Sequence, residues 1–396
     1  MFYFVSITIF QVMDNHNYHV LFISSWFPSE QEPFSGNFVI RHAEAAAKYN
    51  KVSIANVSYA PLIDKANLSI IPEIKLFEKQ IKPYRLKPVN FIRTLYYYWK
   101  LYKKINVEEG KIDIIHANVI FPASLIALFI KKITGIPYII SEHWTGYLSA
   151  NKVKRPLYVK LLAALGASNA SCLCPVTENL KEAMQNAGFK NSYKVIPNVL
   201  NLQHFFIADK APDNDIKQII HVSNLKNEHK NINGIIDVLA RLCKVRQDFM
   251  LKIISDGDIE RVKDYALKKE LPDNHVEFHT ALSPAKLGEV FRASHFMVLF
   301  SNYENLPCVL IEAMACGIPA ISTDVGGIKE HLTPDKGIII EAKDESALED
   351  AINHMLDHYE SYDREALHSY SANKFSYEAV GSSFSSLYKQ VINKML

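Results

Sequence analysis

Two glutamates eight residues apart mark the stretch of the chain that is richest in candidate chemistry. Glu304 and Glu312 lie in the segment SNYENLPCVLIEAMACGIPAISTDVGG, residues 301–327. We expect a strand to end near Ser301, a loop to carry Glu304, and Pro307 to begin a helix, since proline suits the first helical turn. The start of such a helix directs backbone N–H groups and positive partial charge toward an anion such as a phosphate. The carboxylate of Glu304 beside it can accept hydrogen bonds from sugar hydroxyls.

A second polar segment, HVSNLKNEHKNING (221–234), directly follows an apolar run at 218–222. Lys226 and Lys230 supply cations just after this predicted strand. A cation in this place can neutralise a diphosphate leaving group, which is the main electrostatic task when a sugar leaves a nucleotide. The alternative for Lys230 is a solvated surface lysine.

Four further candidates lie in the first half of the chain. His143 follows the apolar run 138–141, and α/β proteins bind ligands at the carboxyl ends of such strands, so we expect this histidine to hydrogen-bond a ligand. Gly36 opens the first expected helix, where a simple turn is the alternative. His116 and Asn118, in HANVIFP, are candidates for the acceptor side of a site, and a packing role for them stays equally open.

The segment Asp256-Gly257-Asp258 superficially matches an Asp-X-Asp metal motif. It follows a predicted strand at 251–255, and its residue types are those of a turn, so we discount a metal there. The five cysteines have neither zinc nor redox spacing, and we interpret them as reduced core residues of a cytoplasmic protein. We therefore expect no metal site.

Short apolar runs alternate with helical segments along most of the chain. Runs of this kind are typical of parallel strands covered by helices on both faces. Polar residues 198–215 interrupt the pattern, and we interpret them as a linker between domains 1–197 and 216–375. An amphipathic helix is expected at 376–396, with the option that it packs back on the first domain. The expected strands lie at 19–24, 52–57, 112–116, 138–141, 170–175, 193–196, 218–222, 251–255, 276–280, 295–301, 320–323 and 338–341.

The fold class expected from this order is α/β, with two doubly wound, Rossmann-like units facing each other across a crevice. The length of 396 residues also exceeds the roughly 100–200 residues of a single domain. The net charge of +2 conceals an asymmetry: residues 1–200 carry 23 Lys and Arg against 13 Asp and Glu, and the remainder carries 21 against 29. A basic first half favours an anionic partner such as a membrane surface, a phosphate-bearing substrate or a nucleic acid.

The segment 79–104 contains eight basic residues and no acidic residue, interleaved with aromatic residues. This composition favours peripheral contact with anionic lipid headgroups. Nucleic-acid binding uses the same ingredients, and a helix with a solvated basic face is a third alternative. Of these we favour a membrane contact, on the inner face of the plasma membrane, and expect no nucleic acid. The apolar start, 1–13, is too short to span a bilayer, and a natural start at either Met1 or Met13 stays open.

These motifs resemble those of glycosyltransferase family 4, whose members have the GT-B fold. The resemblance is carried by Glu304 and Glu312 with MACGIPAISTDVGGIKE after them, and it covers nearly the whole chain. It implies that Glu304 lies at the transferred sugar and Glu312 at the nucleotide ribose. Backbone N–H groups around Asn305, Leu306 and Pro307 are then expected to hold the sugar and the distal phosphate.

The resemblance also implies roles for the other segments. Lys230 matches a family lysine, His143 matches the active-site histidine, and Gly36 matches a glycine whose backbone approaches the donor phosphate. Asn224 stands where the family has an arginine, and asparagine donates a hydrogen bond without bringing a charge. Lys226 is the candidate that replaces the missing charge.

We therefore expect a retaining glycosyltransferase that moves a sugar from a nucleoside-diphosphate sugar to an acceptor, with the stereochemistry implied by the resemblance. The expected acceptor is a lipid-linked glycan in the assembly of cell-surface polysaccharide or glycolipid. The nucleotide-sugar is a substrate, and no resident cofactor is expected. The alternative is a catalytically impaired GT-B protein that only binds carbohydrate or nucleotide, and Asn224 is the residue that favours it.

Overall fold

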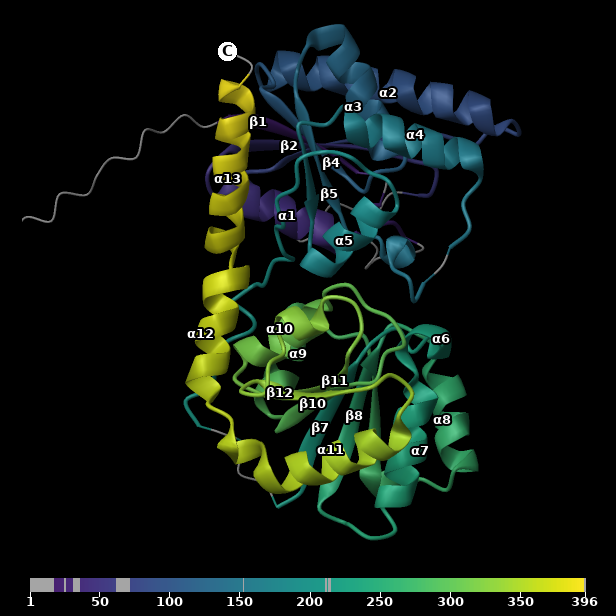
Figure 1. Ribbon diagram of the computed structural model, residues 1–396, viewed down its shortest axis with the longest axis vertical. Coiled ribbons are helices and arrows are strands. Elements are labelled where there is room, and N and C mark those ends of the chain that lie inside the picture. The colour runs from purple at the N-terminus through teal and green to yellow at the C-terminus, as the bar shows by residue number, and fades with distance from the viewer. Residues whose placement is uncertain are drawn as a thin grey trace, which may run out of the picture.

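The computed structural model describes residues 18–24, 26–30, 36–61, 72–151, 153–210, 212 and 215–394. Within these ranges the chain forms two α/β domains stacked along the long axis of the molecule (Figure 1). Each domain is built on a six-stranded parallel sheet, as the apolar runs predict. The two candidate starts of the chain, Met1 and Met13, lie outside the described residues.

The first sheet has the strand order β3-β2-β1-β4-β5-β6. The chain therefore reverses its direction of winding between β1 and β4, and open sheets of this kind bind ligands at the carboxyl ends of the strands near such a switch point. All the pairs are parallel. The strands are β1 (His19–Ser24), β2 (Lys51–Ser58), β3 (Lys75–Gln80), β4 (Ile114–Asn118), β5 (Tyr138–Glu142) and β6 (Cys172–Pro175).

The second sheet repeats this topology in the order β12-β11-β10-β7-β8-β9, and its switch point lies between β7 and β10. Its pairs are also parallel. The strands are β7 (Lys217–Val222), β8 (Phe249–Ser255), β9 (Val276–Thr280), β10 (Phe296–Leu299), β11 (Ala320–Thr323) and β12 (Gly337–Ile340).

Helices cover both faces of each sheet. In β1, Leu21 and Ile23 face a core shared with α2, α3 and α4, whereas Val20 and Phe22 face a core shared with α1 and α13. None of the helices in the described part of the chain is long and apolar enough to cross a bilayer. The helices up to the last two are α1 (Asn37–Ala47), α2 (Lys87–Glu108), α3 (Ala123–Thr134), α4 (Leu157–Ser168), α5 (Glu178–Asn186), α6 (Asn227–Lys230), α7 (Ile232–Leu242), α8 (Ile259–Lys268), α9 (Pro284–Arg292), α10 (Cys308–Ala315) and α11 (Glu345–His358).

The last two helices, α12 (Arg364–Phe375) and α13 (Tyr377–Asn393), run along one side of both domains (Figure 1). α13 packs against α1, and Gly381 permits this close approach, because a Cβ at that position would lie 2.1 Å from the carbonyl oxygen of Ala45. The chain passes between the domains around Leu200 and again around Ser376. The two passages pair, since the N–H of Leu200 donates to the carbonyl of Phe375 at 2.7 Å.

The structure corrects two expectations about strands. β3 was not expected, because an edge strand with the sequence KLFEKQ is largely exposed and lacks an apolar run. The segment 193–196 was expected to be a strand, but it pairs with β6 at an isolated bridge between Tyr193 and Leu173, followed by a single bond from the N–H of Ile196 to the carbonyl of Pro175 at 3.0 Å. The reason is that Pro175 of β6 has no N–H group to donate at the next rung of the ladder.

Candidate active site

Glu304 and Lys230 meet at the carboxyl ends of the second sheet. β10 ends at Leu299, and the following loop turns the Glu304 side chain toward Lys230, which is the last residue of α6. Lys230 Nζ donates to Glu304 Oε1, and Ser301 Oγ donates to the same oxygen at 2.8 Å. Both members of the ion pair are largely buried. The structure thus brings together the two residues expected at the sugar and at the leaving phosphate.

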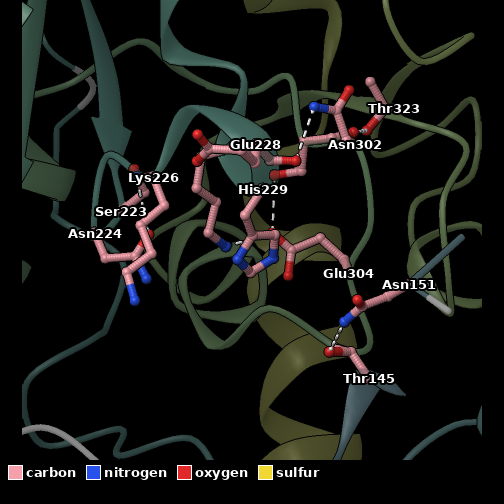
Figure 2. Close-up of polar contacts among 12 residues, drawn as sticks. Thr145, Asn151, Ser223, Asn224, Lys226, Glu228, His229, Asn302, Glu304 and Thr323 are labelled. Carbon is pink, nitrogen blue, oxygen red and sulfur yellow. Dashed lines mark hydrogen bonds and ion pairs between the residues drawn. The ribbon is translucent and has the colours of Figure 1, made fainter. Parts of the chain in front are cut away.

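The His229 ring lies beside the Glu304 carboxylate, near the same oxygen that Lys230 contacts (Figure 2). Its Nε2 atom is 3.6 Å from Glu304 Oε1, and its ring stacks on Tyr303 with centroids 4.2 Å apart. Burial raises the pKa of Glu304, but the Lys230 ammonium and His229 outweigh burial and lower this pKa to about 2. Glu304 is therefore a carboxylate at neutral pH, and it accepts hydrogen bonds.

Glu312 lies in α10 and faces the first domain. Arg41 of α1 donates from Nη1 to Glu312 Oε1 at 2.9 Å and to the carbonyl of Val199 at 3.4 Å. The Glu312 side chain is 3% exposed, and that of Arg41 is 21% exposed. The carboxylate expected at the nucleotide ribose is thus held by a helix of the opposite domain.

Asn305 joins the two domains directly. Its Nδ2 atom donates to the carbonyl of His143 at 3.2 Å, and its Oδ1 atom accepts from Thr177 Oγ1 at 2.8 Å. The carbonyl of Leu306 accepts from Asn198 Nδ2 at 2.8 Å. The loop that follows β10 therefore lies in the interface, in contact with the loop that follows β5.

Pro307 is the N-cap residue of α10, and no side chain of the described residues caps this helix. Gly326 and Gly327, which follow β11, pack against the backbone of the loop that carries Glu304. A Cβ at Gly326 would lie 1.9 Å from the carbonyl oxygen of Glu304, and the N–H of Gly327 donates to the carbonyl of Asn305 at 3.0 Å. Since a larger residue at Gly326 cannot fit, these glycines hold the loop and the start of α10 in place.

His143 lies directly after β5, and its ring stacks on Phe38 with centroids 3.9 Å apart. Burial, together with the neighbouring His42 and His116, lowers the pKa of His143 well below its usual value, so the ring is neutral. Its Nε2 atom and Oδ1 of Asn198 are buried and form no hydrogen bond of standard geometry within the described residues, although the Asn198 side chain is close enough to raise the pKa of the ring in part. Such unsatisfied atoms suit the hydroxyl groups of a ligand.

Glu142 organises the loop that carries His143. One carboxylate oxygen accepts the N–H groups of His143 and Trp144, both at 2.8 Å, and the other accepts the N–H of Ile120 at 2.8 Å.

Gly36, the N-cap of α1, has φ 78° and lies against the backbone of Trp26, because a Cβ would be 2.5 Å from the carbonyl oxygen of that residue. The role of Gly36 at the donor phosphate stays a prediction.

The positions Asn224 and Lys226 lie apart from Glu304, on the opposite side of His229 in Figure 2. Asn224 Oδ1 accepts from the N–H of Lys226 at 3.3 Å. The structure therefore does not place Lys226 in contact with the Lys230–Glu304 pair. The guanidinium group beside the loop of Asn224 belongs to Arg261 of α8, whose Nη2 atom donates to the carbonyl of Leu225 at 2.6 Å.

His116 and Asn118 are fully buried in β4. The ring nitrogens of His116 bond to Tyr388 Oη and Ser141 Oγ, both at 2.7 Å, so this histidine ties the sheet to α13. Asn118 Nδ2 donates to the carbonyl of His116 at 3.3 Å. His116 lies close enough to His143 to lower its pKa, but within the described residues neither His116 nor Asn118 hydrogen-bonds to Glu304, Lys230 or Asn305.

Sequence reasoning missed Arg41, Thr177 and Asn198 of the interface, and His229 beside Glu304. Their partners lie far away in the sequence, so spacing gave no signal, although His229 lies inside the segment 221–234 and Arg41 in the helix that Gly36 was expected to open. Asp258, from the Asp-X-Asp segment, accepts the N–H of Arg261 at 3.1 Å and caps α8. This cap is the turn role that its residue type favours.

Comparison with known proteins agrees with this geometry. Residues 36–204 match the family described as Glycosyltransferase Family 4, and residues 203–373 match the family described as Glycosyl transferases group 1. A glycosyltransferase of Methanocaldococcus jannaschii is 26% identical over 69% of this chain and 74% of its own length. The alpha-monoglucosyldiacylglycerol synthase of Streptococcus pneumoniae is 23% identical over 54% of this chain and 52% of its own length.

Solved structures share the fold. Sucrose-phosphate synthase from Thermosynechococcus elongatus superposes with a TM-score of 0.77 at 19% identity, covering 96% of this chain and 100% of that one. Anabaena HepE in complex with UDP-glucose superposes with a TM-score of 0.71 at 17% identity, covering 94% and 99%. The matched families, the two doubly wound sheets and the glutamates at their interface agree, and the chain belongs to glycosyltransferase family 4 and has the GT-B fold.

Proposed function

We propose that this protein is a retaining glycosyltransferase that moves a sugar from a nucleoside-diphosphate sugar to a lipid-linked glycan. The observation that carries the proposal is the contact between Lys230 and Glu304. A diphosphate that binds the Lys230 ammonium puts its attached sugar beside the Glu304 carboxylate. The sugar hydroxyls then take over hydrogen bonds that this carboxylate makes with the protein in the structure.

The leaving group sets the main energetic demand on such a site. As the bond to the sugar breaks, negative charge grows on the phosphate, and Lys230 with the first N–H groups of α10 stabilises it. We infer that these groups do so without a metal ion. In this proposal neutral His143 hydrogen-bonds the sugar, and Glu312 accepts from the ribose hydroxyls. Retention of configuration follows from the family resemblance, and no side chain has to form a covalent bond.

The substrates proposed here have separate support. The UDP-glucose bound by HepE supports a nucleoside-diphosphate sugar as donor. The name of the Streptococcus pneumoniae relative supports a glycolipid product and hence an acceptor that carries a lipid. The basic residues of 79–104 support peripheral contact with the inner face of the plasma membrane, where such an acceptor is exposed.

A panel of nucleotide-sugars tests the proposal. We expect one donor to raise the melting temperature of the wild type by mass action and to lose its sugar slowly to water. Glu304→Ala and Lys230→Ala should abolish this hydrolysis, whereas Lys286→Ala, which removes an exposed lysine of α9, should leave it unchanged. Each ligand-induced shift is compared with the same variant without ligand, because loss of the buried pair also destabilises the fold.

The same panel tests the binding-protein alternative, which Asn224 favours. Binding of a nucleotide-sugar without any turnover, even with lipid-linked acceptors present, supports that alternative. Absence of binding by every nucleotide and nucleotide-sugar contradicts the transferase proposal.

A further inference from the structure

Helix α4 (Leu157–Ser168) turns its large apolar side chains away from the protein. Its buried residues are mostly small: Val159, Ala163, Gly166 and Ala167. The outward side chains are exposed by 71% at Leu157, 62% at Tyr158, 63% at Leu161, 36% at Leu162 and 49% at Leu165. We call these five residues the α4 ridge. A surface helix ordinarily has the opposite arrangement, with the large apolar residues inside.

The orientation of α4 is fixed by its neighbours. A Cβ at Gly166 would lie 2.0 Å from Ser124 Oγ, so α4 rests directly on α3 through this glycine. The hydroxyl of the fully buried Tyr138 donates to the carbonyl of Gly166. Leucines of the ridge have no room on this inner face, because it is filled by close helix–helix contact. The ridge is therefore a permanent part of the surface.

The surroundings of the ridge are basic. α3 and α4 contain no acidic residue, and α2, α3 and α4 cover the same face of the first sheet (Figure 1). Exposed lysines lie on each of the three helices, among them Lys103 of α2, Lys132 of α3 and Lys160 of α4. On α2 the exposed Tyr96 adds an aromatic side chain, and the Lys100 ammonium lies 4.8 Å from its ring centroid.

We propose that the α4 ridge inserts into the boundary between headgroups and acyl chains of an anionic lipid bilayer, while lysines of α2 and α3 bind the headgroups. Apolar residues bordered by lysines and aromatic residues are the features of a helix that lies in the plane of a membrane interface. A second copy of the chain is a poorer occupant, because two basic faces repel each other. The inference deepens the proposed function and rests on it only for the acceptor, since a lipid-linked glycan lies at the same surface.

Binding to vesicles tests the inference with the full chain. We expect the wild type to co-sediment with vesicles of phosphatidylcholine mixed with phosphatidylglycerol, and far less with phosphatidylcholine alone. The double variant Leu161→Glu, Leu165→Glu should lower the bound-to-free ratio on the mixed vesicles by about tenfold or more. Leu267→Glu is the matched control, because this leucine of α8 is 66% exposed in the other domain, and its binding should equal that of the wild type.

Three results overturn the inference. The first is that the wild type does not bind the vesicles, and the second is that the double variant binds them equally well. The third is that the wild type sediments as a dimer and the double variant as a monomer, which assigns the α4 ridge to self-association. Circular dichroism of the double variant should match the wild type, since the changed residues are exposed. Donor hydrolysis measured without vesicles separates the two proposals: its absence in the wild type contradicts the transferase proposal and leaves the vesicle result valid.

Discussion

Arg41 of α1 and Glu312 of α10 form an ion pair of 2.9 Å between the two domains, although 271 positions separate them in the chain. The pair fixes the carboxylate that we assign to the ribose, and it does so with a side chain of the domain opposite the nucleotide. We therefore expect this contact to couple donor binding to the relative position of the domains.

Replacing Arg41 by alanine should weaken donor binding and stability together. Glu312 keeps its buried charge but loses its partner, and we expect a loss of about 2–4 kcal/mol in the free energy of unfolding. The KM for the donor should rise by about tenfold, with a smaller change in kcat, because the orientation of Glu312 is lost. Lys48→Ala is the control: it removes an exposed pair with Glu378 and should cost at most about 1 kcal/mol. An unchanged KM for Arg41→Ala contradicts the coupling.

The Glu304 carboxylate should make stability depend on pH in acid. Its pKa in the folded protein is about 2, below the ordinary value, so its contribution is complete above about pH 4.5 and is lost as the pH falls toward 2. The difference in unfolding free energy between the wild type and Glu304→Gln should narrow by about 1 kcal/mol between about pH 6 and pH 3.5. Urea unfolding at several pH values measures this difference, and a constant difference counts against the depressed pKa.

The buried histidines of the first domain should destabilise the fold in mild acid. Burial lowers the pKa of His42 to about 4 and that of His116 well below its usual value. Below about pH 6.5 the unfolded chain takes up protons that the folded chain does not, so stability falls as the pH drops from about 6.5 toward 4. In the His42→Gln variant, the decrease in the free energy of unfolding between about pH 7 and pH 5 should be smaller than in the wild type by about 1–2 kcal/mol. The same pH dependence in this variant and the wild type is the contrary result.

Glu330 should stabilise the contact between the two domains, which we call the Glu330 latch. Its carboxylate accepts the N–H groups of Glu178 and Asn179 at 2.9 and 2.8 Å, so a side chain of the second domain caps α5 of the first. Glu330→Ala should lower the free energy of unfolding by about 1 kcal/mol and speed hydrogen exchange in the first turn of α5. Lys181→Ala removes only a surface pair with Glu178 and should leave that exchange unchanged. Equal exchange in Glu330→Ala and the wild type refutes the latch.

Local features of the sequence were sufficient to predict most strands and the strand–loop–helix junction around Glu304. The buried strands are mostly apolar, and β1 and β11 match their expected bounds. The two strand errors have local causes that the pattern of apolar residues does not contain: β3 is a polar edge, and Pro175 interrupts a ladder. Glu304, Pro307 and Glu312 keep their relation because the same loop and helix carry all three.

Contacts between distant segments were decided by the tertiary structure alone. The sequence determined that Glu304 and Glu312 are acidic, but only the fold decided that Lys230 and Arg41 neutralise them. It likewise determined that α4 is rich in leucine, but only packing on Ser124 decided which face turns outward. The physical reason is that residue spacing fixes which side chains share a face of an element, whereas the neighbour that covers this face depends on how the elements pack.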